Sequence, residues 1–592
     1  MTDPIHYRIC PLYPRAHRFA VSVTVAEPDP EGQVFSLPAW IPGSYMIREF
    51  ARNIVSIRAE ADGKAVALEK LDKHSWRAAR VPAGRALTLH YEVYAWDLSV
   101  RAAHLDHTHA FFNGTSVFLK VHGHSARPCT VDIQPPVDER LRDWRVITAL
   151  PRASGRGAAK AYGFGLYRAA DYDELIDHPV EMGRFTLGSF QVGEVVHDVA
   201  LTGRHDCDMV RLTADLKRIC AWQVDLFGAP APMDYYAFLV MIVGDGYGGL
   251  EHRASTALLA SRADLPYAGM KAMTKGYRQF LGLCSHEYFH TWNVKRIKPA
   301  AFTPYDLAAE NYTRLLWAFE GFTSYYDDLA LVRSGVIEVD DYLALIGQTL
   351  SNVLRTPGRR RQSVAESSFD AWIKYYRQDE NAPNAIVSYY AKGALVALAL
   401  DLQLRAASAG QKSLDDVMRL LWQHYGQTGI GVPEDGIFAA VAQIGGTSLA
   451  RWLRRAVEGT DDLPLARLLK PFGIVCTAEP ASTAPWLGAK LAVDGEPRLV
   501  HVYDDGPAQR AGLSAGDVLV ALDGLKVDAR GLDAMLARRR PGERIELYAF
   551  RRDELLRFEL ELATPPADQI SLKPAAKASA AARRLRRGWL GR

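Results

Sequence analysis

The sequence predicts a multidomain α+β protein with a β-rich first part, a mostly α middle part and a smaller mixed unit near its end. Short runs of alternating apolar and polar residues, separated by Gly, Pro and Asp turns, fill the first part. Longer segments with the apolar spacing of helices fill the middle. With 592 residues, 48% of them hydrophobic and 23% charged, the chain is long enough for several globular domains.

The β-rich part is expected over residues 1–178, where "HRFAVSVTV", "LTLHYEVYAW" and "TSVFLKV" read as strands. The same part contains three closely spaced histidines, His104, His107 and His109. We expect no metal site there, because the run lies among strands and no acidic or cysteine cluster accompanies it.

The mostly α part is expected over residues 179–478 and contains the segment "HEYFH". On a helix, residues four apart lie on one face, so the imidazoles of His286 and His290 could reach the same ion. Glu287 projects close enough to touch a metal-bound water without being a ligand. Two imidazoles leave a tetrahedral zinc ion short of one protein ligand and a water.

A carboxylate from a second helix could supply that ligand. In "LLWAFEGFTSYYDD", Glu320 lies among Trp317, Phe319 and Phe322. A buried carboxylate needs a partner, and zinc is a suitable one. Asp327, two turns further on, could accept the free N–H of a ligating histidine. The alternative for Asp327 is a solvated position at the end of the helix.

The smaller mixed unit is expected over residues 484–564 and resembles a PDZ domain in "GPAQRAGLSAGDVLVALDG". The segment "PWLGAKL" lies where such domains place the loop that receives a peptide carboxylate. Residues 565–592, rich in Ala, Lys and Arg, are expected to form a flexible basic tail. Contact of this tail with nucleic acid or an anionic membrane is the alternative.

Several longer segments are similar to one enzyme family. "HEYFHTWNVKRIKP", "PYDL", "LLWAFEGFTSYYDDLALVRSG" and "PAWIPGSYMIREFARNI" resemble the glycyl aminopeptidase family of zinc metallopeptidases. The resemblance implies a β-rich N-terminal domain, a thermolysin-like catalytic domain and a C-terminal PDZ domain. It also implies one zinc ion per chain and release of N-terminal residues from peptides, with Gly and Ala favoured.

Residue by residue, the resemblance makes His286, His290 and Glu320 the zinc ligands and Glu287 the general base. The insertion at residues 291–309 is shared with this family, but the sequence gives it no physical role.

The resemblance also extends to "GYGGLEH", where it makes Glu251 the group that binds the α-ammonium of the substrate. Gly248 and Gly249 would let a peptide approach as an added strand. Without the resemblance, Glu251 reads as a glutamate at a strand edge. His252 stands where the larger aminopeptidase group has Asn, so its role is open.

In "SYYAKGALV" the resemblance places the hydroxyl of Tyr390 opposite the substrate carbonyl. Tyr389 is the rival for this role, and a packed core tyrosine is the alternative for either residue. The mechanism that follows is hydrolysis of the first peptide bond with Glu287 moving the proton.

Composition limits the partners and the location. A net charge of +3 is too small to argue for nucleic acid, and no apolar run is long enough for a membrane span. Dispersed cysteines and the lack of a signal peptide pattern favour the cytoplasm, with an undetected export route left open. The expected partners are peptides with a free N-terminus, and either a peptide C-terminus or another partner at the PDZ unit. A zinc endopeptidase and a PDZ-bearing binding protein with a vestigial site are the alternative functions.

Overall fold

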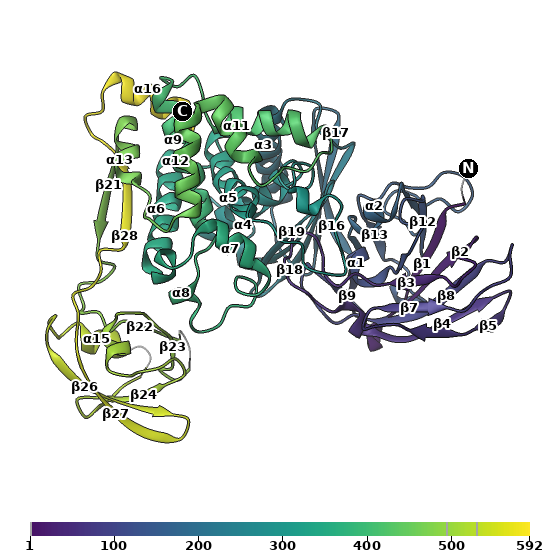
Figure 1. Ribbon diagram of the computed structural model, residues 1–592, viewed down its shortest axis with the longest axis horizontal. Coiled ribbons are helices and arrows are strands. Elements are labelled where there is room, and N and C mark those ends of the chain that lie inside the picture. The colour runs from purple at the N-terminus through teal and green to yellow at the C-terminus, as the bar shows by residue number, and fades with distance from the viewer. Residues whose placement is uncertain (1–2, 493–494, 529–530, 592) are drawn as a thin grey trace. The chain divides into compact units, whose positions relative to one another are not determined.

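Figure 1 shows the computed structural model, which describes residues 3–492, 495–528 and 531–591. The chain divides into two units. Unit 1 comprises Met1–Asn311, Ser334–Ile337 and Trp422–Gly431, and unit 2 comprises Tyr312–Arg333, Glu338–Leu421 and Val432–Arg592. The predicted α+β class, with β-structure first and helices after it, is confirmed. No helix in the described ranges combines the length and the apolar character needed to cross a membrane.

Unit 1 begins with a seven-stranded sheet of order β14-β12-β1-β2-β8-β4-β5. Strands such as β2 bury every second residue, which is the pattern of a sheet with one face on a core. The strands are β1 (Ile5–Tyr13), β2 (Arg18–Val25), β4 (Ile54–Ala61), β5 (Lys64–Val66), β8 (Leu87–Tyr94), β12 (Cys129–Ile133) and β14 (Gly165–Ala169).

Two four-stranded sheets accompany it, with orders β13-β15-β10-β9 and β11-β3-β7-β6. The first comprises β9 (Ala103–Leu105), β10 (His109–Phe112), β13 (Arg145–Ile147) and β15 (Val180–Gly183). The second comprises β3 (Val34–Ser36), β6 (Leu68–Lys70), β7 (Ser75–Ala78) and β11 (Lys120–Val121). Two short helices, α1 (Gly114–Val117) and α2 (Tyr172–Ile176), connect these strands.

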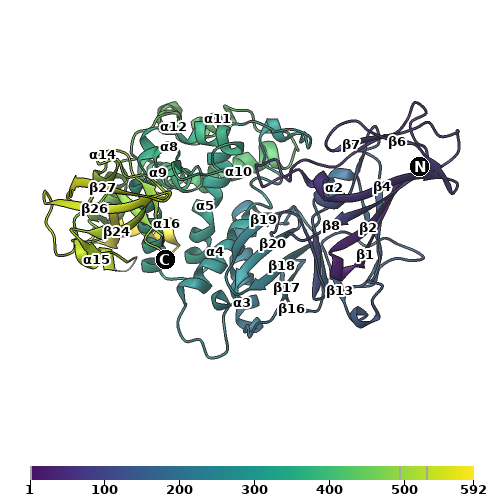
Figure 2. The same ribbon diagram turned by 90° about the horizontal axis from the view of Figure 1, so that it is seen from below.

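The rest of unit 1 is a five-stranded mixed sheet with two helices, and Figure 2 shows the five strands side by side. The order is β16-β17-β18-β20-β19, so β19 is an edge strand among the residues described. Helices α3 and α4 pack against each other and against the sheet. The elements are β16 (Phe185–Val192), β17 (Val195–Thr202), α3 (Met209–Phe227), β18 (Tyr235–Val243), β19 (Tyr247–Glu251), β20 (Ser255–Ser261) and α4 (Lys275–Phe289).

Unit 2 is mostly helical up to Leu469. Its central contact joins α5 and α9, which cross where Gly321 meets Gly393. Both helices are apolar on most faces, as expected for helices that other elements surround. The helices are α5 (Leu316–Arg333), α6 (Val339–Arg355), α7 (Val364–Phe369), α8 (Ala382–Ala385), α9 (Ala391–Ala407), α10 (Leu414–Leu421), α11 (Gly436–Gly445), α12 (Thr447–Glu458) and α13 (Leu465–Leu469).

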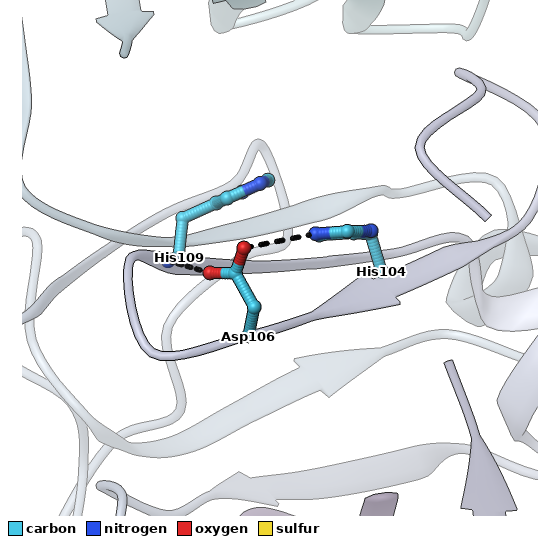
Figure 3. Close-up of side chains that lie close together, drawn as sticks. All are labelled: His104, Asp106 and His109. Atoms are coloured by element: carbon cyan, nitrogen blue, oxygen red, sulfur yellow. Dashed lines mark hydrogen bonds and ion pairs between the residues drawn. The ribbon is translucent and has the colours of Figure 1, made fainter. Parts of the chain in front are cut away.

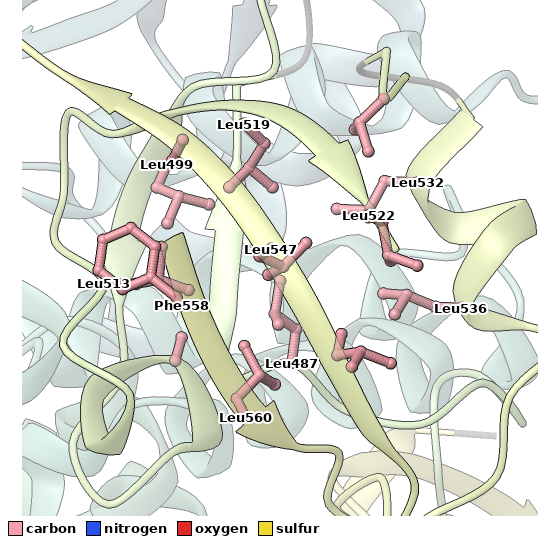
Figure 4. Packing of buried hydrophobic residues seen from close by; sticks show 14 of the residues in the cluster. Leu487, Leu499, Leu513, Leu519, Leu522, Leu532, Leu536, Leu547, Phe558 and Leu560 are labelled. Atoms are coloured by element: carbon pink, nitrogen blue, oxygen red, sulfur yellow. The ribbon is translucent and has the colours of Figure 1, made fainter. Parts of the chain in front are cut away.

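The PDZ-like unit has its own hydrophobic core, part of which Figure 4 shows. Leucines from its strands and helices, among them Leu499, Leu522 and Leu547, pack around Phe558. The elements are β22 (Ala489–Leu491), β23 (Leu499–Val502), α14 (Pro507–Arg510), β24 (Val518–Leu522), β25 (Leu525–Lys526), α15 (Gly531–Leu536), β26 (Arg544–Arg551) and β27 (Glu554–Glu561).

The prediction of a flexible basic tail over residues 565–592 is wrong. This segment forms β28 (Gln569–Pro574) and α16 (Ala580–Leu590). β28 pairs with β21 (Ile474–Glu479), which lies before the PDZ-like unit in the chain. Trp589 in α16 is fully buried, and its indole Nε1 donates to the hydroxyl of Tyr325 in α5 at 3.0 Å. The segment after the PDZ-like unit is therefore part of the helical body of unit 2.

Candidate active site

The predicted histidine pair lies at the end of α4. The helix begins after Thr274, whose side chain accepts the N–H of Tyr277 at 3.1 Å. His286 lies in its last turn, and His290 follows its last residue. The two imidazole rings are 4.6 Å apart between centroids. The pair therefore shares one face of the helix end, as the spacing predicts.

His290 is held in the tautomer that a metal ligand needs. Its Nδ1 lies 2.6 Å from the carbonyl oxygen of Asn293. Because a carbonyl oxygen only accepts, Nδ1 carries the proton and Nε2 keeps its lone pair. After α4 the chain continues as a hydrogen-bonded turn, in which the amide of Asn293 donates to the carbonyl of Phe289. This turn brings the Asn293 carbonyl back to the imidazole, and the histidines present fit a bound metal ion.

Glu287 is buried beside the edge strand β19. A Cβ added at Gly249 would lie 2.0 Å from Glu287 Oε1, so the strand backbone passes directly against this carboxylate. At Gly248 the nearest atoms would be 4.0 Å away. The missing side chain at position 249 is therefore what lets the carboxylate occupy its place beside the strand.

Glu251, at the end of β19, lies in the same place. It is buried, with 4% of its surface exposed. Glu251, Glu287 and His290 each offer an atom within 4.8 Å of the others. The structure thus brings the predicted ammonium-binding residue to the predicted base. A buried carboxylate beside a second one is suited to a cation, because two like charges are otherwise costly to bury.

The N-terminal segment "PAWIPGSY" also reaches Glu251. A Cβ added at Gly43 would lie 2.4 Å from Glu251 Oε2, and the φ of Gly43 is +95°. Both the conformation and the lack of space require glycine at this position. Sequence patterns do not reveal the role of Gly43, whose only signal is its place inside a segment that resembles the family.

The insertion at residues 291–309 has a structural role, because it holds that segment. The amide of Ala39 donates to the carbonyl of Leu307 at 2.7 Å, and Trp40 Nε1 donates to the carbonyl of Asp306 at 2.8 Å. The ring of Tyr45 stacks on Phe302 at 5.7 Å. The insertion therefore supports the residues on both sides of Gly43.

A buried group of charges adjoins Glu251. Lys295 Nζ lies 2.6 Å from Asp177 Oδ1, and His252 Nδ1 lies 3.4 Å from the same oxygen. The amide of Arg253 donates to Asp177 Oδ2 at 3.1 Å. Burial alone would raise the pKa of Asp177, but Lys295, His252 and Arg253 lower it well below its usual range. His252 thus faces Asp177, which ties the end of β19 to the insertion.

Unit 2 carries the remaining predicted residues. Glu320 in α5 has 1% of its surface exposed. Burial is the main cause that raises the pKa of Tyr375 and Tyr389, and the charge of Glu320 adds to both effects. Glu320 is therefore close to this tyrosine group. Asp327, half-buried on the same helix, accepts the N–H of Asp328 at 2.5 Å.

The two candidate tyrosines differ in accessibility. Tyr389 is fully buried, whereas Tyr390, just before α9, is half-buried. The hydroxyl of Tyr390 lies 3.2 Å from that of Tyr376. Only a hydroxyl near a surface can meet a substrate in the folded protein, so this difference favours Tyr390 over Tyr389.

Comparison with known proteins gives consistent matches. Residues 6–184 match the model of the peptidase M61 N-terminal domain, residues 279–396 that of the M61 glycyl aminopeptidase, and residues 485–562 that of the PDZ domain. The crystal structure of an aminopeptidase N family protein from Idiomarina loihiensis is 42% identical. That match covers 99% of this chain and 100% of the other, with a TM-score of 0.94.

A more distant match is the M1 zinc metallopeptidase from Deinococcus radiodurans, 16% identical with a TM-score of 0.48. It covers 78% of this chain and 95% of the other. A likeness this low does not bear on the chemistry.

Proposed function

This chain belongs to the M61 glycyl aminopeptidase family, and from that premise we propose that it is a zinc-dependent aminopeptidase that removes the N-terminal residue from peptides. The observation that carries the proposal is the group formed by Glu251, Glu287 and His290. It combines a metal-binding imidazole, a carboxylate placed to act as a base and a second carboxylate suited to an ammonium group.

We propose that His286, His290 and Glu320 hold one zinc ion for this reaction. Two imidazoles and one carboxylate are a donor set that can hold a metal ion, and such sets are typical of catalytic zinc. When bound, the ion would supply Lewis acidity to the scissile carbonyl and to the attacking water. Asp327 is proposed to orient one of the histidines, since a carboxylate that accepts a ring N–H fixes the tautomer.

Side chains of this protein would carry the proton and position the substrate. Glu287 takes a proton from the attacking water and delivers it to the leaving amine. The hydroxyl of Tyr390 donates to the oxygen on which negative charge develops. Glu251 binds the α-ammonium, and the free edge of β19 at Gly248 and Gly249 receives the peptide as an added strand. The peptide bond one residue from the N-terminus would then lie at the metal.

The proposed preference for Gly and Ala as first residues rests on the family resemblance. A panel of aminoacyl anilides tests it together with the main proposal. Purified protein should contain metal, and a chelator should abolish hydrolysis that added zinc restores. Full activity in chelator would refute the proposal, and a metal-free, inactive protein would favour a binding protein with a vestigial site.

Glu251→Gln should lower kcat/KM on free-amine substrates by at least about tenfold. A carboxylate that receives an ammonium forms a charge-assisted hydrogen bond worth roughly 1.5–3 kcal/mol, and the amide of Gln keeps the shape but lacks the charge. The measurement is kcat/KM on Gly-anilide and acetyl-Gly-anilide for both proteins. An equal loss on the two substrates would mean that Glu251 does not bind the amine, and rapid cleavage of the blocked one would favour an endopeptidase.

Gly249→Ala should lower kcat by roughly 100-fold, because a misplacement of about 1 Å in a catalytic group can have an effect of that size. The new methyl group would overlap Glu287 Oε1 and displace either the carboxylate or the strand. Gly248→Ala is the matched control on the same strand and should have a much smaller effect on kcat, since its nearest atoms are 4.0 Å away. Because Gly248 is proposed to receive the peptide, any loss there should appear mainly in KM. Similar losses in the two variants would argue against a specific contact with Glu287.

We also propose that the PDZ domain binds a peptide C-terminus. A cavity of about 240 Å³ lies between the segment that contains Trp486 and Leu487 and the helix α15. Its wall includes β22, the strand beside which PDZ domains add a peptide. Arg355 also lines this cavity and would meet a bound peptide.

The cytoplasm stays the proposed location. All six cysteines carry free thiols, as expected for a protein in a reducing compartment. The charge of +3 gives no reason to propose nucleic acid as a partner.

A further inference from the structure

A second group of side chains that could hold a metal ion lies in unit 1. His104 lies in the strand β9, Asp106 lies in the turn that follows, and His109 begins β10, which pairs with β9. Figure 3 shows Asp106 turned toward the ring of His104 and the backbone nitrogen of His109, and the two imidazole rings stack at 4.8 Å between centroids. Each offers a ligand atom within 4.8 Å of the others. The sequence shows no acidic cluster beside these histidines, but the fold brings Glu181 from β15 to His109, and Asp106 lies beside His104.

The turn holds Asp106 in place. Its Oδ1 accepts the amides of Thr108 at 2.6 Å and His109 at 3.1 Å. Its Oδ2 is thereby directed to His104 Nε2, 3.5 Å away. Tetrahedral zinc with bonds of about 2.0–2.1 Å separates its ligand atoms by about 3.4 Å. The carboxylate is therefore held at a spacing that suits a shared ion.

His109 is oriented by a buried carboxylate on the neighbouring strand. Its Nδ1 lies 3.1 Å from Oε1 of Glu181 in β15, and both side chains are buried. Within the described residues its Nε2 is buried without a hydrogen-bond partner. Nδ1 therefore donates to Glu181, and the buried Nε2 keeps a lone pair. A carboxylate behind an imidazole in this way also makes the free nitrogen a stronger metal ligand.

A small cavity adjoins the group. It has a volume of about 20 Å³ and is lined by His104, His109 and Glu181 and by apolar side chains that include Leu239 and Leu258. A space of this size holds a single water molecule or ion. A single trapped water is thus the alternative occupant.

We propose that His104, Asp106 and His109 form a second metal site that takes a divalent transition-metal ion, with zinc as the expected occupant, and that Glu181 orients His109. Two imidazoles and a carboxylate suit zinc better than calcium or magnesium, which prefer oxygen ligands alone. The ion would join the β9–β10 hairpin to its own turn, with Glu181 linking it to β15. Its role is structural, because none of these residues is among those proposed for catalysis.

The test measures bound zinc in the full-length protein, in which His290→Ala removes the proposed catalytic ion. After loading with zinc and gel filtration, this variant should keep about one zinc per chain. Adding His109→Gln or Asp106→Asn should remove that zinc. Adding His107→Gln should not, since His107 is exposed in the same hairpin and lies outside the group. Circular dichroism confirms that each variant is folded.

A second measurement is the thermal midpoint in the His290→Ala background. Zinc should raise it, and the rise should disappear with Asp106→Asn, which keeps the size of the side chain. Equal zinc content with and without His109→Gln, or a rise that Asp106→Asn leaves unchanged, would overturn the proposal and favour a trapped water. If His290→Ala keeps as much zinc as the wild type, the proposal for the catalytic zinc site is wrong. The effect of His109→Gln on zinc content still tests the second metal site in that case.

Discussion

Replacing Glu287 with glutamine is expected to leave the metal bound and to lower kcat by roughly 10²–10⁴-fold, the usual contribution of a general base. Gln has the size of Glu and fits the space beside Gly249, so the fold of β19 and α4 should not change. Its amide cannot accept a proton from water, however, and the reaction loses its base.

Zinc content and kcat on Gly-anilide, measured together, check this expectation. His290→Ala is the contrasting variant, because it removes a proposed ligand and should lose both zinc and activity. A Glu287→Gln protein with full activity would show that another group moves the proton. A Glu287→Gln protein without zinc would mean that Glu287 is needed for metal binding rather than for proton transfer.

The helices of the chain were predictable because their signals are local. Apolar periodicity over "VRLTADLKRICAWQVDLF" corresponds closely to α3 (Met209–Phe227), and the run around Glu320 to α5 (Leu316–Arg333). Gly335 and Gly410, which follow α5 and α9, have the positive φ that is common where a helix ends. Such features depend on a few neighbouring residues, so the sequence alone is sufficient to find them.

The surroundings of the site were not predictable in this way. Gly43 meets Glu251, and Trp40 donates to the carbonyl of Asp306, although these partners are more than two hundred positions apart. A backbone carbonyl, such as that of Asn293 beside His290, is present in every residue type, so the sequence does not show which one will contact a side chain. These contacts depend on tertiary packing, which cannot be predicted from the apolar pattern or the secondary-structure propensities of the sequence.

The C-terminal segment shows that composition can also predict the wrong structure. Its many Arg, Lys and Ala residues suggested a solvated tail, but the charges lie mostly on the exposed face of α16. Trp589 and Leu590 are buried, and β28 finds its partner β21 on the other side of the PDZ domain in the sequence. Composition counts the charges and does not show which face of a helix they occupy.

Trp589→Ala is accordingly expected to lower the free energy of unfolding of the helical body by about 3–5 kcal/mol, the usual range for a buried tryptophan. The indole packs against the rings of Tyr342 and Phe472, and its Nε1 donates to the Tyr325 hydroxyl. Chemical denaturation of the two proteins gives the difference. Arg584→Ala on the exposed face of the same helix is the control and should change stability by less than about 0.5 kcal/mol.

Because Trp589 is buried in the helical body, we expect different outcomes from two deletions that both remove the PDZ domain. Truncation after Thr483 removes β28 and α16 as well, and it leaves Arg333 without the Trp589 carbonyl to which its Nε donates at 2.8 Å. We expect that protein to be insoluble or inactive.

Excision of residues 484–563 with a short linker keeps both elements. It loses few contacts with the helical body, chiefly the hydrogen bonds of Asn384 to Val502 and Asp504. Because β21 and β28 pair from Glu479↔Gln569 onward, the cut ends are close enough to join. The excised protein should hydrolyse Gly-anilide at nearly the wild-type rate. A soluble, fully active truncation would show that the helical body needs neither the PDZ domain nor the segment that follows it. An unfolded excision variant would show that its stability depends on the PDZ domain.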